Sequence, residues 1–246
     1  MKIEQDKPPG LSAAAGARSP ELGRCGMNVD ELALIARQLY VGGPYLMRKM
    51  MHYRIRICPF ERLIPHVASR ASVLDVGCGS GLFLALLSAA VPDVAGVGFD
   101  SSRPAIAMAG RVAEQVRLSG LRAELRFVRL DIVESWPAGL FDVVSLVDVL
   151  HHIPPAHQKS VIERATKKVK PGGVLLYKDM ANRPAFQAGM NRLHDLLLAR
   201  QWIHYLPIRC VDEWAAEFGL ALTHAEAISR LWYRHELRIY RKPPNL

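Results

Sequence analysis

A glycine-rich turn between two apolar segments constrains the fold of this chain more than any other feature. Residues 73–81 read Val-Leu-Asp-Val-Gly-Cys-Gly-Ser-Gly, and a second apolar stretch follows at residues 82–91. An apolar run that ends in glycines and passes directly into a helix is typical of a buried parallel strand. Glycine permits backbone conformations and close approaches that a Cβ blocks, and the N–H groups at a helix N-terminus can bind a ligand. The sequence therefore predicts a strand, a turn and a helix with a ligand at their junction.

The spacing of the glycines indicates which ligand this is. A dinucleotide-binding turn has the pattern G-x-G-x-x-G. Here Gly81 comes one position too early, and Leu82 stands where that pattern requires glycine. Asp75 precedes Gly77 by two residues, and its carboxylate suits a ligand with a positively charged amino group better than a phosphate. A pyrophosphate-binding turn is therefore disfavoured.

Two further apolar segments end in an acidic residue. Residues 96–100 read Gly-Val-Gly-Phe-Asp, and Asp100 stands nineteen residues after Gly81. An acid at about this distance, at the tip of the second strand, suits a pair of hydrogen bonds to ribose hydroxyls. Residues 126–131 form a third candidate strand that ends in Asp131. Two alternatives stay open, since Asp100 also suits a helix cap and Asp131 a turn.

The strands of the central region alternate with helical segments, which predicts βαβ units and a parallel sheet. Residues 141–152 supply a fourth strand with its following loop, and residues 170–177 supply a turn and a fifth strand. This ordered set of five signals resembles the class I S-adenosylmethionine-dependent methyltransferases, whose first motif reads [DE]-x-G-x-G-x-G. The resemblance covers residues 72–180.

The resemblance implies an α/β fold with a doubly wound, seven-stranded, mostly parallel sheet. Helices cover both faces, a helical lid is added, and the last strand is antiparallel between the fifth and sixth. It also implies S-adenosyl-L-methionine as the cofactor, with the acid after the third strand on the adenine amino group. The expected cofactor-binding residues are Asp75, Gly77, Cys78, Gly79, Gly81, Asp100, Ser101, Asp131, Ile132 and Val147.

The chain divides into a tail, a pair of helices and a core. We expect a disordered tail at 1–27, lid helices at 28–71, and the methyltransferase core at 72–246 with a lid insertion at 180–209. The first lid helix is expected from Asp30, and the second follows Pro44. Both lid segments should reach over the carboxyl ends of the strands. Their expected apolar residues are Met47, Met51, Phe186, Met190 and Leu193, with His204 near the transferred methyl group.

Catalytic residues are harder to predict than cofactor residues, because a methyl group on sulfur is already activated and the protein chiefly supplies orientation. His152 and His204 are candidate general bases, against the alternative that both only pack. His151, His152 and His157 match no standard metal spacing, so no metal is expected. Among the basic residues at 48–56, one arginine could pair with the cofactor carboxylate or with an anionic substrate.

Composition restricts the remaining possibilities. The chain has 246 residues and a formal net charge of +9. Its basic residues are scattered, which favours a solvated surface or an anionic small substrate over nucleic acid. Residues 147–150 lack the Asn/Asp-Pro-Pro-aromatic signature of enzymes that methylate exocyclic amines of bases. Four cysteines without metal or disulfide spacing, no signal peptide and no long apolar run indicate a cytoplasmic protein.

We therefore expect a methyltransferase for a small or lipid-like acceptor, with oxygen as the preferred target and carbon as the second. An RNA or protein methyltransferase that uses the basic surface is the first alternative. A non-catalytic cofactor-binding module is the second alternative.

Overall fold

The computed structural model describes residues 26–181, 204, 206–231 and 233–244, and it shows a single mixed sheet. The order of the strands is β3-β2-β1-β4-β5-β7-β6. Strand β7 pairs antiparallel with β5 and β6, and all other neighbouring strands pair parallel. The strands are β1 (Ser72–Val76), β2 (Ala95–Asp100), β3 (Glu124–Arg129), β4 (Phe141–Val147), β5 (Val169–Met180), β6 (Ala221–Arg230) and β7 (Tyr233–Arg241). The predicted sheet, with its antiparallel last strand between the fifth and sixth, is confirmed.

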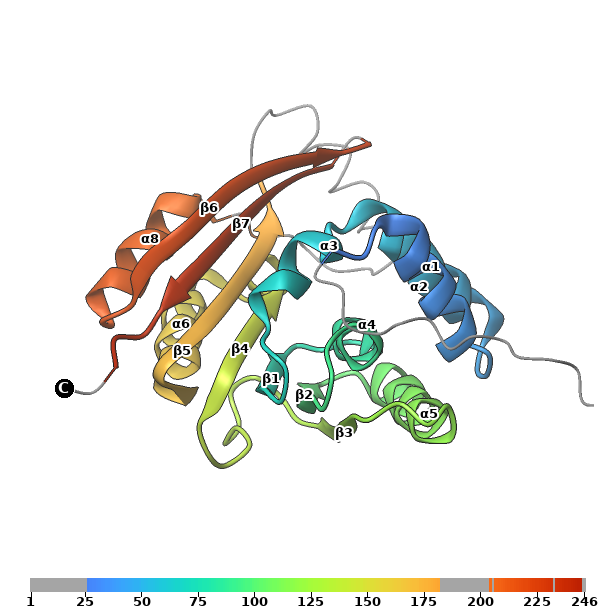
Figure 1. Ribbon diagram of the computed structural model, residues 1–246. Coiled ribbons are helices and arrows are strands. Elements are labelled where there is room, and N and C mark those ends of the chain that lie inside the picture. The colour runs from blue at the N-terminus through green and yellow to red at the C-terminus, as the bar shows by residue number, and fades with distance from the viewer. Residues whose placement is uncertain (1–25, 182–203, 205, 232, 245–246) are drawn as a thin grey trace, which may run out of the picture.

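Helices cover both faces of this sheet, as Figure 1 shows. One face carries α1 (Val29–Leu39), α2 (Tyr45–Ile57), α3 (Phe60–Leu63), α4 (Leu82–Ala90) and α5 (Arg103–Leu118). The other face carries α6 (Pro155–Lys168) and α8 (Ile208–Glu217). Two short 3-10 helices, η1 (Ile64–His66) and η2 (Leu150–His152), complete the described elements. None of the described helices is long and apolar enough to cross a membrane.

Alternation along the strands divides the core into two parts. Successive side chains of a strand point to opposite faces. Val73 and Val143 accordingly pack under α1, α4 and α5, whereas Leu74 and Val144 pack under α6 and α8. Burial of one such aliphatic side chain contributes about 1.5–3 kcal/mol. The sheet is therefore held from both sides, and its carboxyl edge is the part left to build a site.

Helix α1 begins earlier than the sequence pattern predicted. Its N-cap is Asn28, whose side-chain oxygen accepts hydrogen bonds from the backbone N–H groups of Asp30 (2.9 Å) and Glu31 (3.0 Å). The carboxylate of Glu31 accepts the N–H of Asn28 in return, at 2.8 Å. This capping box stabilises the helix start by about 1 kcal/mol.

The connection from β3 to β4 departs from the expected alternation of strands and helices. Residues 130–140 form turns and contain Pro137 and Gly139, which disfavour a helix. Trp136 fills the space over the sheet edge, with its ring centroid 5.2 Å from that of Phe99. A single aromatic side chain thus covers apolar surface that a helix would otherwise cover.

Candidate functional site

The glycine turn after β1 has the geometry of a ligand-binding loop. Gly77, Gly79 and Gly81 have φ angles of +65°, +53° and +77°. A Cβ on Gly81 would lie 2.6 Å from the ring of Phe127, so packing requires glycine there. A Cβ on Gly79 would meet nothing within 4 Å, so the loop is open on this side. Positive φ and an open face together leave the backbone of Gly79 accessible to a ligand.

Asp100, at the end of β2, braces this loop. One carboxylate oxygen accepts the N–H of Gly79 at 2.9 Å, and the other accepts the N–H of Ser102 at 2.8 Å, where α5 begins. Ser101 is exposed beside it. The structure thus places Asp100 at the predicted strand tip, and it shows the helix-start contact of the alternative interpretation as well.

Asp75 lies buried beneath the loop. The hydroxyl of Ser145 donates a hydrogen bond to its carboxylate at 2.7 Å. Burial raises the pKa of Asp75 to about 7. It lines a small cavity together with Cys78, Val147 and, from α2, Arg54. A buried carboxylate that is costly to ionise is suited to a cationic ligand group, so this cavity fits the ammonium group of S-adenosylmethionine.

Asp131 and Ile132 lie on the loop after β3. The N–H of Leu130 donates to the carbonyl of Asp100 at 3.1 Å, which brings this loop beside the end of β2. Asp131 is exposed and accepts the N–H of Val133 at 3.1 Å, the geometry of an Asx turn. The carbonyl of Ile132 accepts the indole N–H of Trp136 at 2.9 Å. Asp131 is therefore a turn residue at the predicted edge of the sheet.

A second cavity adjoins the first on the side of β5 and β7. Met51 and Arg54 line both cavities, so α2 covers the carboxyl ends of the central strands. Met47 instead packs against the core. The other walls of the second cavity come from η2 and its preceding loop and from the ends of β5 and β7. The expected lid residues Phe186, Met190 and Leu193 lie outside the described residues.

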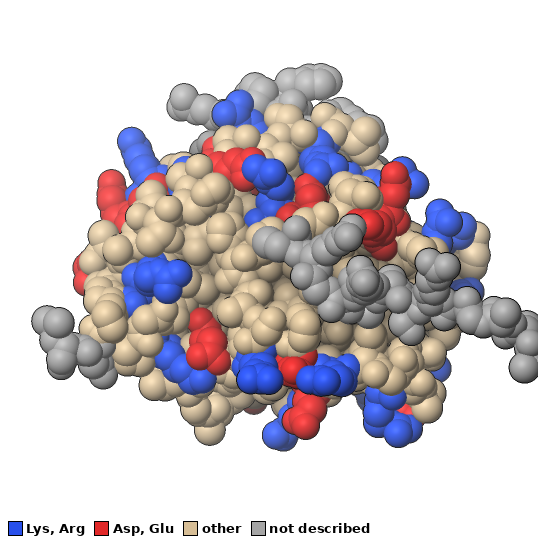
Figure 2. Space-filling view, in the orientation of Figure 1, with Lys and Arg blue, Asp and Glu red and all other residues tan. Residues whose placement is uncertain are grey.

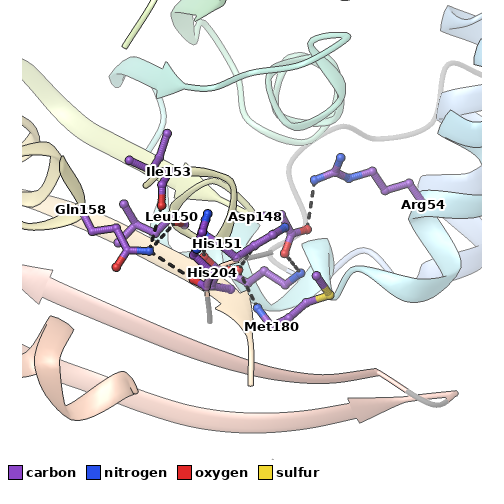
Figure 3. A network of polar contacts seen from close by, with 10 residues as sticks. Arg54, Asp148, Leu150, His151, Ile153, Gln158, Met180 and His204 are labelled. Atoms are coloured by element: carbon purple, nitrogen blue, oxygen red, sulfur yellow. Dashed lines mark hydrogen bonds and ion pairs between the residues drawn. The ribbon is translucent and has the colours of Figure 1, made fainter. Parts of the chain in front are cut away.

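Charged side chains meet at the base of the second cavity. One carboxylate oxygen of Asp148 accepts a hydrogen bond from the ammonium of Lys178 at 2.6 Å, and the other accepts one from the guanidinium of Arg54 at 3.0 Å. Burial alone would raise the pKa of Asp148, but Lys178 and Arg54 hold it well below its usual value. Figure 3 shows Arg54 extending from α2 toward this carboxylate. Asp148 has a φ of +58°, a strained conformation for a residue other than glycine.

A histidine–aspartate pair lies next to this cluster. The Nδ1 atom of His151 makes a short hydrogen bond to the carboxylate of Asp179, and both residues are buried. Asp179 also accepts the backbone N–H of Met180 at 2.7 Å. Because an ionised carboxylate can only accept hydrogen bonds, Nδ1 of His151 is the donor in this pair. His151 lines the second cavity.

The two predicted catalytic histidines, His152 and His204, both contact His151. The ring of His152 lies 4.0 Å from that of His151, centroid to centroid. It reaches the surface, yet desolvation and His151 lower its pKa to about 4. The backbone N–H of His204 donates to the carbonyl of His151 at 2.8 Å, and Gln158 donates to the carbonyl of His204 at 3.2 Å (Figure 3). His204 is therefore held through its backbone.

Asp148, His151 and Asp179 offer potential metal-ligand atoms within 4.8 Å of one another. Lys178 already neutralises Asp148, and His151 already binds Asp179. Both carboxylates thus already have partners within the described residues, and the absence of a metal stays a prediction.

Three residues of this site were not predicted from the sequence: Lys178, Asp179 and His235. A signal for the first two exists, because a Lys-Asp pair directly follows the apolar run of the fifth strand. Adjacent opposite charges at the carboxyl end of a buried strand are costly unless each has a partner.

Comparisons with known proteins agree with this geometry. A family model described as a methyltransferase domain matches residues 47–225. The ubiquinone biosynthesis O-methyltransferase of Methylococcus capsulatus is 32% identical over 115 residues, covering 46% of this chain and 45% of that relative. The chain thus spans about half the length of the curated relatives it matches.

Solved structures with similar folds bind the same class of cofactor. The magnesium protoporphyrin IX methyltransferase of Synechocystis, with bound S-adenosylhomocysteine, has a TM-score of 0.61 and 17% identity, covering 85% of this chain and 92% of that one. An O-methyltransferase from neocarzinostatin biosynthesis has a TM-score of 0.59 and 25% identity, covering 78% of this chain and 55% of that one. It was solved with S-adenosylhomocysteine and 1,4-dihydroxy-2-naphthoic acid.

Proposed function

The chain belongs to the class I S-adenosylmethionine-dependent methyltransferases, and we propose that it methylates a hydroxyl oxygen of a small organic acceptor. The observation that carries this proposal is the His151–Asp179 pair, which lines a cavity adjoining the cofactor cavity. The relatives named as O-methyltransferases support the choice of oxygen.

The proposed cofactor contacts follow from the position of each group. Asp75 binds the ammonium group, the backbone at Gly79 approaches the ligand, and Asp100 binds the ribose. Arg54 reaches the same cavity and pairs with the carboxylate. Asp131, on the loop after β3, accepts a hydrogen bond from the adenine amino group. S-adenosylmethionine supplies a methyl group on a positively charged sulfur, and the S–C bond breaks as the O–C bond forms.

His151 is the proposed general base. An alcohol or phenol carries its proton at neutral pH, and oxygen becomes a good nucleophile as that proton leaves. Nε2 of His151 takes the proton, and Asp179 stabilises the resulting imidazolium. His152 is a weaker candidate, because a base with a pKa of about 4 accepts a proton poorly at neutral pH.

We also propose that residues 28–71 act as a cover for the acceptor. Helix α2 lies over both cavities, so closure would exclude water and hold the acceptor in line. Hydrogen exchange in α2 should slow when cofactor and acceptor bind together. Unchanged exchange in α2 alongside slowed exchange elsewhere would contradict a covering role.

The RNA and protein alternatives receive less support from the surface. Figure 2 shows the basic side chains of one face separated by acidic and uncharged surface. A covered cavity between α2 and the strands suits a small molecule better than a folded RNA, which needs an open basic groove.

Two measurements test the proposed function. Titration calorimetry should detect binding of S-adenosylmethionine and S-adenosylhomocysteine, and no signal with either would contradict cofactor use. A panel of phenols, catechols and aliphatic alcohols should then yield a methyl ether. His151→Gln should abolish transfer and retain cofactor binding, whereas the exposed His157→Gln on α6 serves as the control. Cofactor binding without turnover on any acceptor would support the non-catalytic alternative.

A further inference from the structure

The outward face of α2 is both apolar and basic. Tyr45 and Leu46 are each 66% exposed, and Met50 is 40% exposed. Lys49 and Arg56 are exposed as well. Because side chains three and four residues apart lie on the same side of a helix, these residues form one continuous surface. This surface, the α2 face, consists of Tyr45, Leu46, Lys49, Met50, Tyr53 and Arg56.

Exposed apolar side chains are concentrated in this part of the chain. Within the described residues, half of the large apolar side chains that are exposed fall between Leu34 and Met50. The others are scattered, as Leu118 on α5 and Leu222 on β6 illustrate. Helix α2 packs beside α1 at the outside of the fold (Figure 1). Single exposed apolar residues are ordinary, whereas a group of them on one element marks a surface for a partner.

The charge of the same region is uniformly positive. No aspartate or glutamate occurs between Glu31 and Glu61. The basic residues between them are Arg37, Arg48, Lys49, Arg54 and Arg56. Arg54 pairs with Asp148, but among the described residues Lys49 and Arg56 pair with no carboxylate. The α2 face therefore carries positive charge that is available to an anionic partner.

The basic and apolar groups of the α2 face are interleaved. The ammonium of Lys49 lies 5.4 Å from the centroid of the Tyr45 ring, and Leu46 is exposed next to that ring. Lysine and arginine can lay their apolar stems along such a surface and keep their charges at its rim. Leucine and tyrosine mixed with lysine and arginine are typical of a helix that lies in the head-group region of a membrane.

The α2 face also continues into the second cavity. Met50 and Tyr53 belong to the face and line the cavity, and Ile57 lines it one turn further along the helix. The face therefore adjoins the cavity in which the proposed acceptor binds.

From these observations we infer that the α2 face docks on a phospholipid membrane with an anionic surface. Tyr45, Leu46 and Met50 enter the boundary between head groups and acyl chains, and Lys49 and Arg56 bind lipid phosphates. Charge complementarity favours this partner over a second copy of the chain, because two copies would bring like charges together. Docking itself does not depend on methyl transfer.

Leu46→Gln and Leu118→Gln are a matched pair of variants. Each replaces a leucine on the surface of a helix, and the two leucines are 66% and 63% exposed. Flotation of the full chain with vesicles measures docking. Wild-type protein should bind vesicles of phosphatidylglycerol and phosphatidylcholine at least about 10-fold more tightly than vesicles of phosphatidylcholine alone. Leu46→Gln should weaken binding about 10-fold, and Leu118→Gln should leave it unchanged.

A second pair of variants tests the charges. Lys49→Gln with Arg56→Gln should weaken binding to the anionic vesicles about 10- to 30-fold. Lys159→Gln with Lys167→Gln removes two charges from α6, on the opposite face of the sheet, and is the control. Sodium chloride at about 0.5 M should abolish the preference for anionic vesicles, because salt screens exposed charges.

Two further measurements exclude indirect effects. The substituted side chains are exposed and line neither cavity. The midpoint of thermal unfolding and the affinity for S-adenosylhomocysteine should therefore change little in any of the four variants.

The outcomes separate this inference from the proposed function. No binding of wild-type protein to anionic vesicles, or equal binding to both kinds of vesicle, overturns the inference. Equal losses in Leu46→Gln and Leu118→Gln also overturn it, because the effect would then not be specific to α2. A dimer in sedimentation velocity that Leu46→Gln dissociates would assign the α2 face to a second copy and overturn it too. Failure to bind S-adenosylhomocysteine would count against the proposed function alone.

Discussion

Replacement of Asp75 by asparagine should make the unliganded protein more stable and weaken its binding of cofactor. The pKa of Asp75 is raised from 3.8 to about 7, because its carboxylate is buried. In the unfolded chain the group loses its proton near pH 4, whereas in the folded protein it keeps the proton up to about pH 7. The folded state therefore binds more protons in this window, and stability falls as pH rises through it.

The magnitude follows from the size of that shift. At 1.36 kcal/mol per unit, a rise from 3.8 to about 7 corresponds to roughly 4 kcal/mol. Asp75→Asn abolishes this cost and keeps the shape of the side chain beside Ser145. The variant should match the parent at pH 4 and exceed it by up to about 4 kcal/mol at pH 8. Urea denaturation at pH 4, 6 and 8 measures the difference.

Cofactor binding should move in the opposite direction. An ammonium group prefers the ionised carboxylate, so the affinity of the parent for S-adenosylhomocysteine should fall about tenfold per pH unit below pH 7. Asp75→Asn should bind more weakly at pH 8 and lose this pH dependence. Asp142→Asn is the matched control, because Ser72 and Lys170 lower the pKa of Asp142 and its neutralisation should destabilise the protein at pH 8. A variant Asp75→Asn that is less stable than the parent at pH 8 would refute the reasoning.

Three further substitutions test the site. Gly79→Val, at a φ of +53°, should cost about 1–3 kcal/mol of folding free energy and abolish S-adenosylhomocysteine binding in calorimetry, and intact binding would show that no ligand approaches this residue. Asp100→Ala should weaken that binding by about 1.5–3 kcal/mol; an unchanged Kd would leave Asp100 as a brace of the loop alone. Asp179→Asn should lower kcat by about 10²- to 10⁴-fold at constant cofactor affinity, and a parallel loss of affinity would contradict its assignment to the base.

Local signals predicted the sheet and the glycine loop. An apolar run followed by glycines determines a strand and a turn within a few residues, and positive φ at Gly77, Gly79 and Gly81 follows from the same pattern. The order of the strands follows from the right-handed connections of such units and from the family resemblance.

The polar network could not be predicted in this way. Lys178 is 30 residues from Asp148, and Arg54 is 94 residues from it. Such contacts depend on strand register and on where α2 packs, and neither leaves a periodic signal in the sequence. The two histidines were visible as a pair, but the distinction between them depends on Asp179, 28 residues away from His151.

Lys178 and Asp179 are consecutive residues of β5, and their side chains point to opposite faces of the strand. Lys178 meets Asp148 on the side of α2, and Asp179 meets His151 on the side of η2. Insertion or deletion of one residue within β5 would exchange these faces. A carboxylate would then face Asp148, and an ammonium would face His151. A change in the length of this strand would therefore invert the charges of both sites at once.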